Sequence, residues 1–256
     1  MCLVLIGYQV SNKYPLIFAA NRDEFHQRPT DPMHFWEQDS CILAGKDLEQ
    51  GGTWFGVHTS GRFAALTNYR DPSSDKTNAP SRGEIIVDLL TSQTPCDLYF
   101  IENKKKMTTY NGFNLLFGNI RELFWFSNVQ KRVEKIPSGI HGLSNQDLNT
   151  AWPKVERGKK ALKQTIKKSI TPPSLFSVLA DQHIPKDPLL PDTGVGIEWE
   201  RLLSPVFIQS DTYGTRSSTV MLINQKGNMR ITERTYPDPG NSKLFTDRDF
   251  LITPQA

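Results

Sequence analysis

Strand-like segments lie at both ends of this chain and helical segments lie in its middle. This order limits the fold classes that the chain can adopt. Residues 2–10 form an almost unbroken apolar run, as in a strand that is covered on both faces. Residues 14–24 follow a turn-like "SNK" and are expected to be its hairpin partner. Strands return at 217–225 and 228–236, with a Lys-Gly turn between them. Because strands and helices do not alternate as βαβ units, the order predicts an α+β layered domain with mostly antiparallel sheets.

The middle of the chain is expected to contain two more hairpins, three helices and one long loop. Ser81 is the predicted N-cap of the first helix, and Gly61 suits the tight turn of a hairpin. No repeat or linker divides residues 1–256, which are therefore expected to form a single domain. The hairpins pair 53–58 with 62–68 and 113–119 with 122–128. One helix begins after residue 81, and the other two cover 153–168 and 172–182. The loop is 183–200.

The charge balance does not indicate a nucleic-acid partner. The chain has 30 basic and 27 acidic residues, a formal net charge of +3. Its most basic stretches, at 103–107 and 156–168, contain no interleaved aromatic residues, and each is typical of a solvated helix face. The expected partner is a small molecule.

Cysteine content and hydropathy bear on the compartment. The three cysteines, at positions 2, 41 and 96, show no CxxC spacing, which indicates a reducing compartment rather than a disulfide framework. The chain contains no run of about 20 apolar residues, the length that a helix needs to span a bilayer. The opening segment lacks a basic region and a cleavage site, so it is not a secretory signal, and the expected location is the cytoplasm.

Several common types of site are excluded by motif. The chain contains no P-loop, no GxGxxG after a strand, no GxSxG and no HExxH. Its five histidines never pair at metal-ligand spacing, so no metal site is expected.

Cys2 offers two interpretations. Cysteine is among the most buried residue types, so Cys2 can be a core thiol. Alternatively, removal of Met1 would expose an amino-terminal nucleophile, whose own α-amine titrates near neutrality and can act as its base. If 2–10 and 14–22 pair as a hairpin, Arg22 of "AANRDEF" lies near Cys2, and a guanidinium there would favour the thiolate. An ion pair of Arg22 with Asp23 or Glu24 is the other explanation of this charged segment.

Ten motifs follow one another along almost the whole chain: "MCL" at 1–3, "NRDE" at 21–24, "AGKDLEQGGTWFGV" at 44–57, "ALTNYRDP" at 65–72, "SRGE" at 81–84, "YNGFNLLFGN" at 110–119, "GLSN" at 142–145, "WPK" at 152–154, "LPDTGV" at 190–195 and "YGTRSST" at 213–219. Together these motifs resemble the NRDE family, which includes the transport and Golgi organisation protein two of animals.

This family in turn resembles the cysteine branch of the N-terminal-nucleophile hydrolases, which includes bile-salt hydrolases and penicillin V acylase. The resemblance implies a four-layer αββα sandwich. It also implies a set of catalytic residues: Cys2 as nucleophile, Arg22 as the neighbouring guanidinium, Asp23 as the acid, Asn68 or Asn145 as oxyanion donor, and Arg216 as a second cation facing the pocket. The acid departs from the pattern, because bile-salt hydrolases place it three residues after the arginine, where this chain has Phe25.

Two functions are therefore expected as alternatives. An enzyme would act on linear amide or acyl-thioester bonds through Cys2 and would need no cofactor. A non-catalytic carrier would use the same pocket to bind acyl-CoA or another lipid, or haem, as the family resemblance implies. Haem would need an axial ligand, for which His26, His34 and His58 are the candidates.

Overall fold

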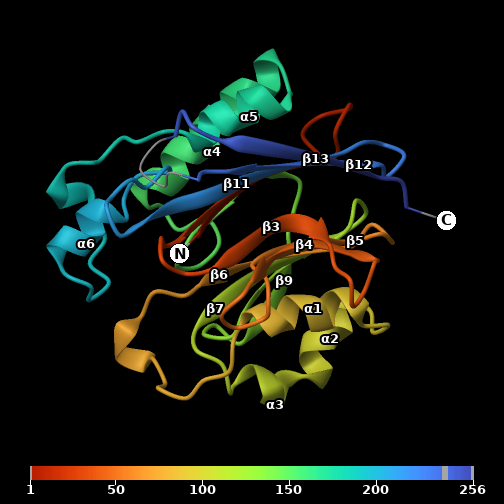
Figure 1. Cartoon of the computed structure of the whole chain (residues 1–256), viewed down its shortest axis with the longest axis horizontal. Coiled ribbons are helices and arrows are strands. Elements are labelled where there is room, and N and C mark those ends of the chain that lie inside the picture. Colours follow the sequence, from red (N-terminus) through yellow and green to blue (C-terminus); the bar gives the residue numbers. More distant parts are fainter. Residues whose placement is uncertain (1, 238–241, 255–256) are drawn as a thin grey trace.

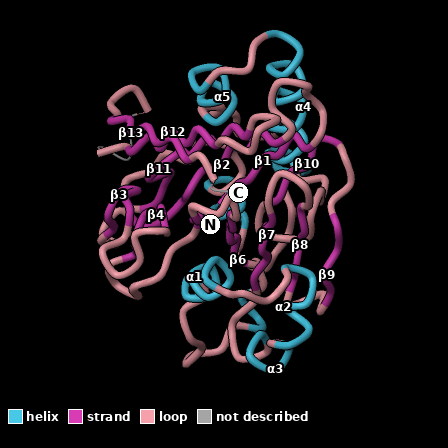
Figure 2. Tube along the Cα trace, turned by 90° about the vertical axis from the view of Figure 1, so that its right-hand side faces the viewer, coloured by secondary structure: helices cyan, strands magenta, loops and turns pink. Residues whose placement is uncertain are grey.

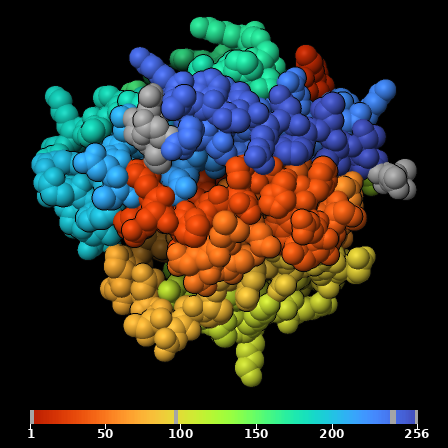
Figure 3. Space-filling model, in the orientation of Figure 1, coloured from red at the N-terminus to blue at the C-terminus, as the bar shows by residue number. Residues whose placement is uncertain are grey.

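In the computed structural model, which describes residues 2–237 and 242–254, two antiparallel sheets lie face to face between two layers of helices (Figures 1 and 2). The side chains of Cys2, Cys96 and Asp97 are outside this description. The predicted four-layer αββα fold is thus confirmed. In Figure 3 the N-terminal segments, red to orange, lie between the blue C-terminal strands and the yellow helical region.

The first sheet combines the two ends of the chain. Its central strands are the N-terminal hairpin and the long C-terminal strand, so residues near position 2 meet residues near position 217. In spatial order its strands are β10 (Gly139–Leu143), β1 (Cys2–Tyr8), β2 (Leu16–Phe25), β11 (Tyr213–Ile223), β12 (Met229–Thr235) and β13 (Thr246–Ile252).

The second sheet follows the chain order from edge to edge, and its successive strands are antiparallel. Their connections are short except between the fourth and fifth strands, where residues 69–112 carry the helices of this side. The hairpins predicted at 53–68 and 113–128 are its centre, and Gly61 adopts the expected positive φ of 93°. Its strands are β3 (Thr30–Phe35), β4 (Ile42–Asp47), β5 (Phe55–His58), β6 (Phe63–Asn68), β7 (Phe113–Gly118), β8 (Leu123–Ser127) and β9 (Arg132–Lys135).

Alternation along the strands divides the apolar side chains among three layers. Val4 and Ile6 of β1 pack between the two sheets, whereas Leu3 and Leu5 face the helices on the outer side. The opening strand is therefore covered on both faces, as its apolar run predicts. Helices α4 (Pro153–Lys168) and α5 (Pro172–Leu179) cover the first sheet, and α1 (Gly83–Thr91) with α2 (Cys96–Glu102) covers the second.

Two local predictions were wrong. Helix α1 begins at Gly83 with Arg82 as its N-cap, so Ser81 lies one residue too early to cap it. The segment 183–200 is not wholly a loop, because α6 (Ile197–Leu202) begins within it. The remaining short helices are α3 (Lys104–Met107) and the 3₁₀ turns η1 (Pro72–Ser74) and η2 (Asp187–Leu189). Over the residues described, every helix is too short or too polar to cross a membrane.

Candidate functional site

A row of four residues crosses the first sheet at the end where β1 begins. The strand register places Cys2 opposite Arg22, Arg22 opposite Ser217, and Ser217 opposite Thr235. The predicted proximity of positions 2 and 22 is therefore present in the backbone pairing. The Cys2 side chain itself lies outside the part of the structure that is described.

Arg22 is a buried cation with an incomplete set of partners. Its side chain is 5% exposed, and its guanidinium lies 4.1 Å from the ring centroid of Trp54, a cation–π distance. Its Nη2 atom is 3.5 Å from Asp47 Oδ2. Its buried Nη1 atom has no hydrogen-bond partner among the described residues. A buried guanidinium with an unused donor is costly, which suits a group that receives a ligand.

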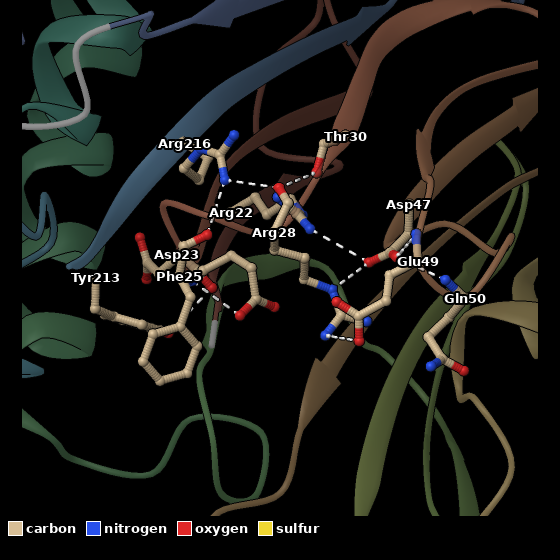
Figure 4. A network of polar contacts seen from close by, with 11 residues as sticks. Arg22, Asp23, Phe25, Arg28, Thr30, Asp47, Glu49, Gln50, Tyr213 and Arg216 are labelled. Carbon is tan, nitrogen blue, oxygen red and sulfur yellow. Dashed lines mark hydrogen bonds and ion pairs between the residues drawn. The ribbon is translucent and has the colours of Figure 1, made fainter.

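Asp47, at the end of β4, holds two arginines together (Figure 4). Arg28 Nε donates to its Oδ2 at 2.7 Å, and the backbone amides of Glu49 and Gln50 donate to Oδ1. Burial alone would raise the pKa of Asp47, but the hydrogen bond from Arg28 and the nearby charges lower it. Asp47 thus stays ionised and orients Arg22. It lies within the "AGKDLEQGG" motif, the one signal in the sequence that pointed to it.

Asp23 follows Arg22 directly, so its side chain leaves the strand on the opposite side. Its Oδ1 accepts a hydrogen bond of 2.7 Å from Thr215 Oγ1, and its backbone carbonyl accepts one from the Tyr213 hydroxyl. Burial raises the pKa of Asp23, against the opposing effect of Lys154. The structure therefore ties Asp23 to β11 rather than to the Arg22 guanidinium.

Asn68 and Asn145, the two predicted oxyanion donors, contact each other. The Asn145 side-chain amide donates to the Asn68 carbonyl at 2.8 Å, and the Asn145 carbonyl accepts from Arg70 N at 2.7 Å. Asn145 is fully buried, whereas Asn68 lines the main cleft. The "TNYRD" and "GLSN" motifs are thus one structural unit.

A buried ion pair is linked to this unit through the backbone amide of Arg70, which donates to Asn145. No pattern in the sequence predicted this pair. Arg70 Nη1 lies 2.8 Å from Glu200 Oε2, and its guanidinium lies 4.9 Å from the Trp152 ring centroid. Glu200 Oε1 also accepts from the backbone and hydroxyl of Thr193, in the "LPDTGV" motif. Arg70 of "ALTNYRDP" and Thr193 of "LPDTGV" therefore meet at one carboxylate, and Trp152 of "WPK" packs on Arg70.

Arg216 occupies the β-bulge of β11, where the register with β2 shifts between Thr215 and Ser217. Its Nη1 donates to the carbonyls of Phe25 and Arg28, which ties down the turn after β2 (Figure 4). Burial lowers the pKa of Arg216, and the neighbouring Arg22 charge lowers it further. Arg216 lines a second cavity rather than the main cleft.

The three candidate haem ligands lie apart from the main cleft. His26 Nε2 is 2.8 Å from the Ser210 carbonyl, His34 Nδ1 is 2.8 Å from the Pro32 carbonyl, and His58 Nδ1 is 2.7 Å from Ser60 Oγ. None of the three is among the described residues that line the cleft. Their imidazoles therefore do not fit the role of an axial ligand in it. The described part of the chain also contains no cluster of three metal-binding side chains.

The main cleft has a volume of about 450 Å³ and lies between the end of β2, the loop before β5 and the start of α1. Arg22, Arg28, Asp47 and Asn68 are among its lining residues. Gly52 allows the loop to approach the helix, because a Cβ on it would lie 2.5 Å from the carbonyl carbon of Gly83. A cleft of this size accommodates a small organic ligand.

Two facing antiparallel sheets between helical layers, with position 2 paired to a buried arginine, define a fold of the N-terminal-nucleophile hydrolase type. Conjugated bile acid hydrolase from Clostridium perfringens, as its C2A mutant, has the same fold. Its TM-score is 0.51 at 11% identity, over 97% of this chain and 92% of that chain.

The chain belongs to the Transport and Golgi organisation 2 family, whose model matches residues 1–238. The human Transport and Golgi organization protein 2 homolog is 34% identical over 100% of both chains. The mouse homolog is 32% identical, over 96% of this chain and 97% of its own. The family and fold expected from the sequence motifs are thus confirmed.

Proposed function

We propose that this protein is a cysteine hydrolase or acyl transferase that uses Cys2, after loss of Met1, on a linear amide or acyl thioester. The observation that carries the proposal is the register of β1 and β2, which puts position 2 opposite the buried Arg22. A guanidinium in that position favours the thiolate, the nucleophilic form of cysteine.

The proposed reaction has two halves. In the first, the Cys2 thiolate attacks the substrate carbonyl, and the tetrahedral intermediate collapses by breaking the C–N or C–S bond. The α-ammonium gives its proton to the departing amine or thiolate. In the second, the α-amine takes a proton from water as the water attacks the acyl-enzyme, and the carboxylic acid leaves. With an amine or thiol acceptor in place of water, the same step transfers the acyl group.

The developing oxyanion needs a donor, and Asn68 and Asn145 are the candidates. One hydrogen of the Asn145 amide is already used by the Asn68 carbonyl. Asn68 lines the cleft beside Arg22. We therefore assign the oxyanion contact to Asn68, with Asn145 as the residue that positions it. Removal of an oxyanion donor typically lowers kcat by about 10²–10³.

The test begins with the intact mass of protein purified at low expression, which reports whether Met1 is removed. Processed protein is then incubated with acyl amides and acyl thioesters, beside Cys2→Ala and a Cys41→Ala control. Turnover lost in Cys2→Ala and kept in Cys41→Ala supports the proposal. Complete retention of Met1 in active protein, or turnover that survives Cys2→Ala, contradicts it. Circular dichroism checks that each variant is folded.

A carrier of acyl-CoA or another lipid is the second candidate. What favours it is the Arg22 Nη1 donor, which Asp47 leaves unused and which suits an anionic group of a ligand in the cleft. For a carrier, Cys2→Ala leaves ligand affinity unchanged and turnover is absent from the unmodified protein. A haem-carrying form would require a Soret shift that one His→Ala change removes.

We also propose a cytoplasmic location, where thiols remain reduced. Cys41 is a free thiol, which agrees with that environment.

A further inference from the structure

A second cavity, of about 240 Å³, is lined by Arg22 and by residues of β11, β12 and the start of β3. It shares Arg22 and Trp54 with the main cleft, and Arg216, Ser217 and Glu233 are found only on its side. The cavity is smaller than the pockets that hold drug-sized ligands, and it suits a compact polar group.

Two residues that line this cavity carry buried hydrogen-bond groups without a partner among the described residues. These groups are Arg22 Nη1 and Ser217 Oγ. Their side chains are 5% and 4% exposed. The strand register places these two residues directly opposite each other on β2 and β11. Since buried polar atoms are nearly always paired, two adjacent orphan donors indicate a bound acceptor.

The charges around the cavity favour an anionic acceptor. Arg22 and Arg216 bring two guanidinium groups to one wall, and their repulsion contributes to the lowered pKa of Arg216, after the effect of burial. Two carboxyl groups also line the cavity, Asp31, which is half-buried, and Glu233, which is 1% exposed. An anion between the two arginines would relieve their repulsion and use both orphan donors.

We propose that this second cavity is a binding site for a small carboxylate or phosphate group, held by Arg22 Nη1, Ser217 Oγ and the guanidinium of Arg216. The site is additional to the proposed acyl chemistry and does not depend on turnover at Cys2.

Glu233 makes this site sensitive to pH. Burial raises the pKa of Glu233 to about 7, so below that pH the carboxyl is neutral and does not repel an anion. The charged and titratable groups that face it are Arg22 on β2, Arg248 on β13, and His34 on β3, and Met33 N donates to its Oε1 at 2.6 Å. We expect anion affinity to fall by up to about tenfold per pH unit above 7.

The experiment uses the full chain as a ¹⁵N-labelled Cys2→Ala protein, so that no turnover occurs. Sodium phosphate and sodium butyrate are titrated separately at constant ionic strength, and the Nε–Hε signals of Arg22 and Arg216 are followed. We expect both signals to shift saturably with a single Kd for at least one of the two anions. The anion with the lower Kd then identifies the ligand class as phosphate or carboxylate.

Four further variants locate the anion and test its pH dependence. Ser217→Ala should raise the Kd about tenfold, the typical effect of losing a hydrogen bond to a charged group. Ser81→Ala, which removes a hydroxyl from the wall of the main cleft, should leave the Kd unchanged. Tested with butyrate, which stays singly charged over this range, Glu233→Gln should remove most of the pH dependence of binding between pH 6 and 8, and His34→Gln should not.

Two outcomes would overturn the proposal. The absence of a saturable shift with either anion would mean that the cavity holds water only. A shift that Ser81→Ala weakens and Ser217→Ala does not would place the anion in the main cleft.

Discussion

Arg70 and Glu200 form an ion pair of 2.8 Å in which both side chains are at least 96% buried. The pair joins residues 130 positions apart, and it connects the segment after β6 to helix α6. Removing one partner would leave an uncompensated charge in a low-dielectric interior.

We therefore expect Glu200→Gln to lower the free energy of unfolding by about 3–5 kcal/mol. Urea denaturation monitored by tryptophan fluorescence measures the change. The control is Glu134→Gln, which breaks the exposed pair of Arg132 and Glu134 and should cost less than about 1 kcal/mol. Equal effects of the two variants would show that the Arg70–Glu200 pair is hydrated and not buried.

Gly52 and Gly83 support a second prediction, on the wall of the main cleft. The Cβ of Gly52→Ala would lie 2.5 Å from a backbone carbon of Gly83, which cannot move without shifting α1. We expect a loss of about 1–3 kcal/mol in the free energy of unfolding, as for other overpacked sites.

The neighbouring Gly51 is the matched control. It has a φ of +75°, and an added Cβ would meet nothing within 4 Å. Asn tolerates this backbone conformation, so Gly51→Asn should be nearly neutral, whereas Gly52→Asn should destabilise more than Gly52→Ala. Thermal unfolding of Gly52→Ala, Gly51→Asn and Gly52→Asn distinguishes conformational strain from steric clash. Equal tolerance of Asn at both positions would refute the close-contact explanation.

Local pairing explains why part of this site was predictable from sequence. A hairpin fixes its own register, so the apolar run at 2–10 and its partner at 14–24 were enough to bring position 2 near Arg22. Helix α4 was likewise predicted with its observed bounds, 153–168, from a Pro at its start and basic residues at its end.

Strands with weak apolar patterns were missed. β3 contains Pro32 and half-exposed residues, and β13 is mostly exposed, as the edge strands of the two sheets can be. The contact of Arg70 with Glu200 depends on tertiary packing across 130 positions, which no local pattern encodes. The sequence offered an ion pair of Arg22 with Asp23 as one alternative, whereas the hydrogen bond of Asp23 to Thr215 depends on the position of β11.

Glu233 leads to a prediction on pH and stability. Its pKa is about 7 in the folded protein, above the ordinary value of 4.5, so between these values the folded state binds more protons than the unfolded state. Stability should therefore fall as pH rises from 5 to 8, by about 3 kcal/mol at most from this group.

Comparison with Glu233→Gln isolates that contribution, because Asp23 also has a raised pKa and acts in the same direction. Urea denaturation at pH 5, 6, 7 and 8 should give a steeper decline for the unmodified protein than for Glu233→Gln. Parallel profiles would mean that Glu233 is ionised throughout this range.

The last prediction concerns the thiol of Cys2 in protein that has lost Met1. Because Arg22 lies opposite position 2 in the strand register, Arg22→Gln should raise the apparent pKa of the thiol by about one or more. Asp47→Asn should act in the opposite direction, since it removes the carboxylate that lies 3.5 Å from the Arg22 guanidinium and partly neutralises it. The pKa follows from the rate of alkylation by iodoacetamide between pH 5 and 10, in a Cys41→Ser, Cys96→Ser background. Opposite shifts of the thiol pKa in the two variants would establish that the charge of Arg22, partly neutralised by Asp47, acts on the thiol. Shifts of the same sign would indicate a general disturbance of the strand end.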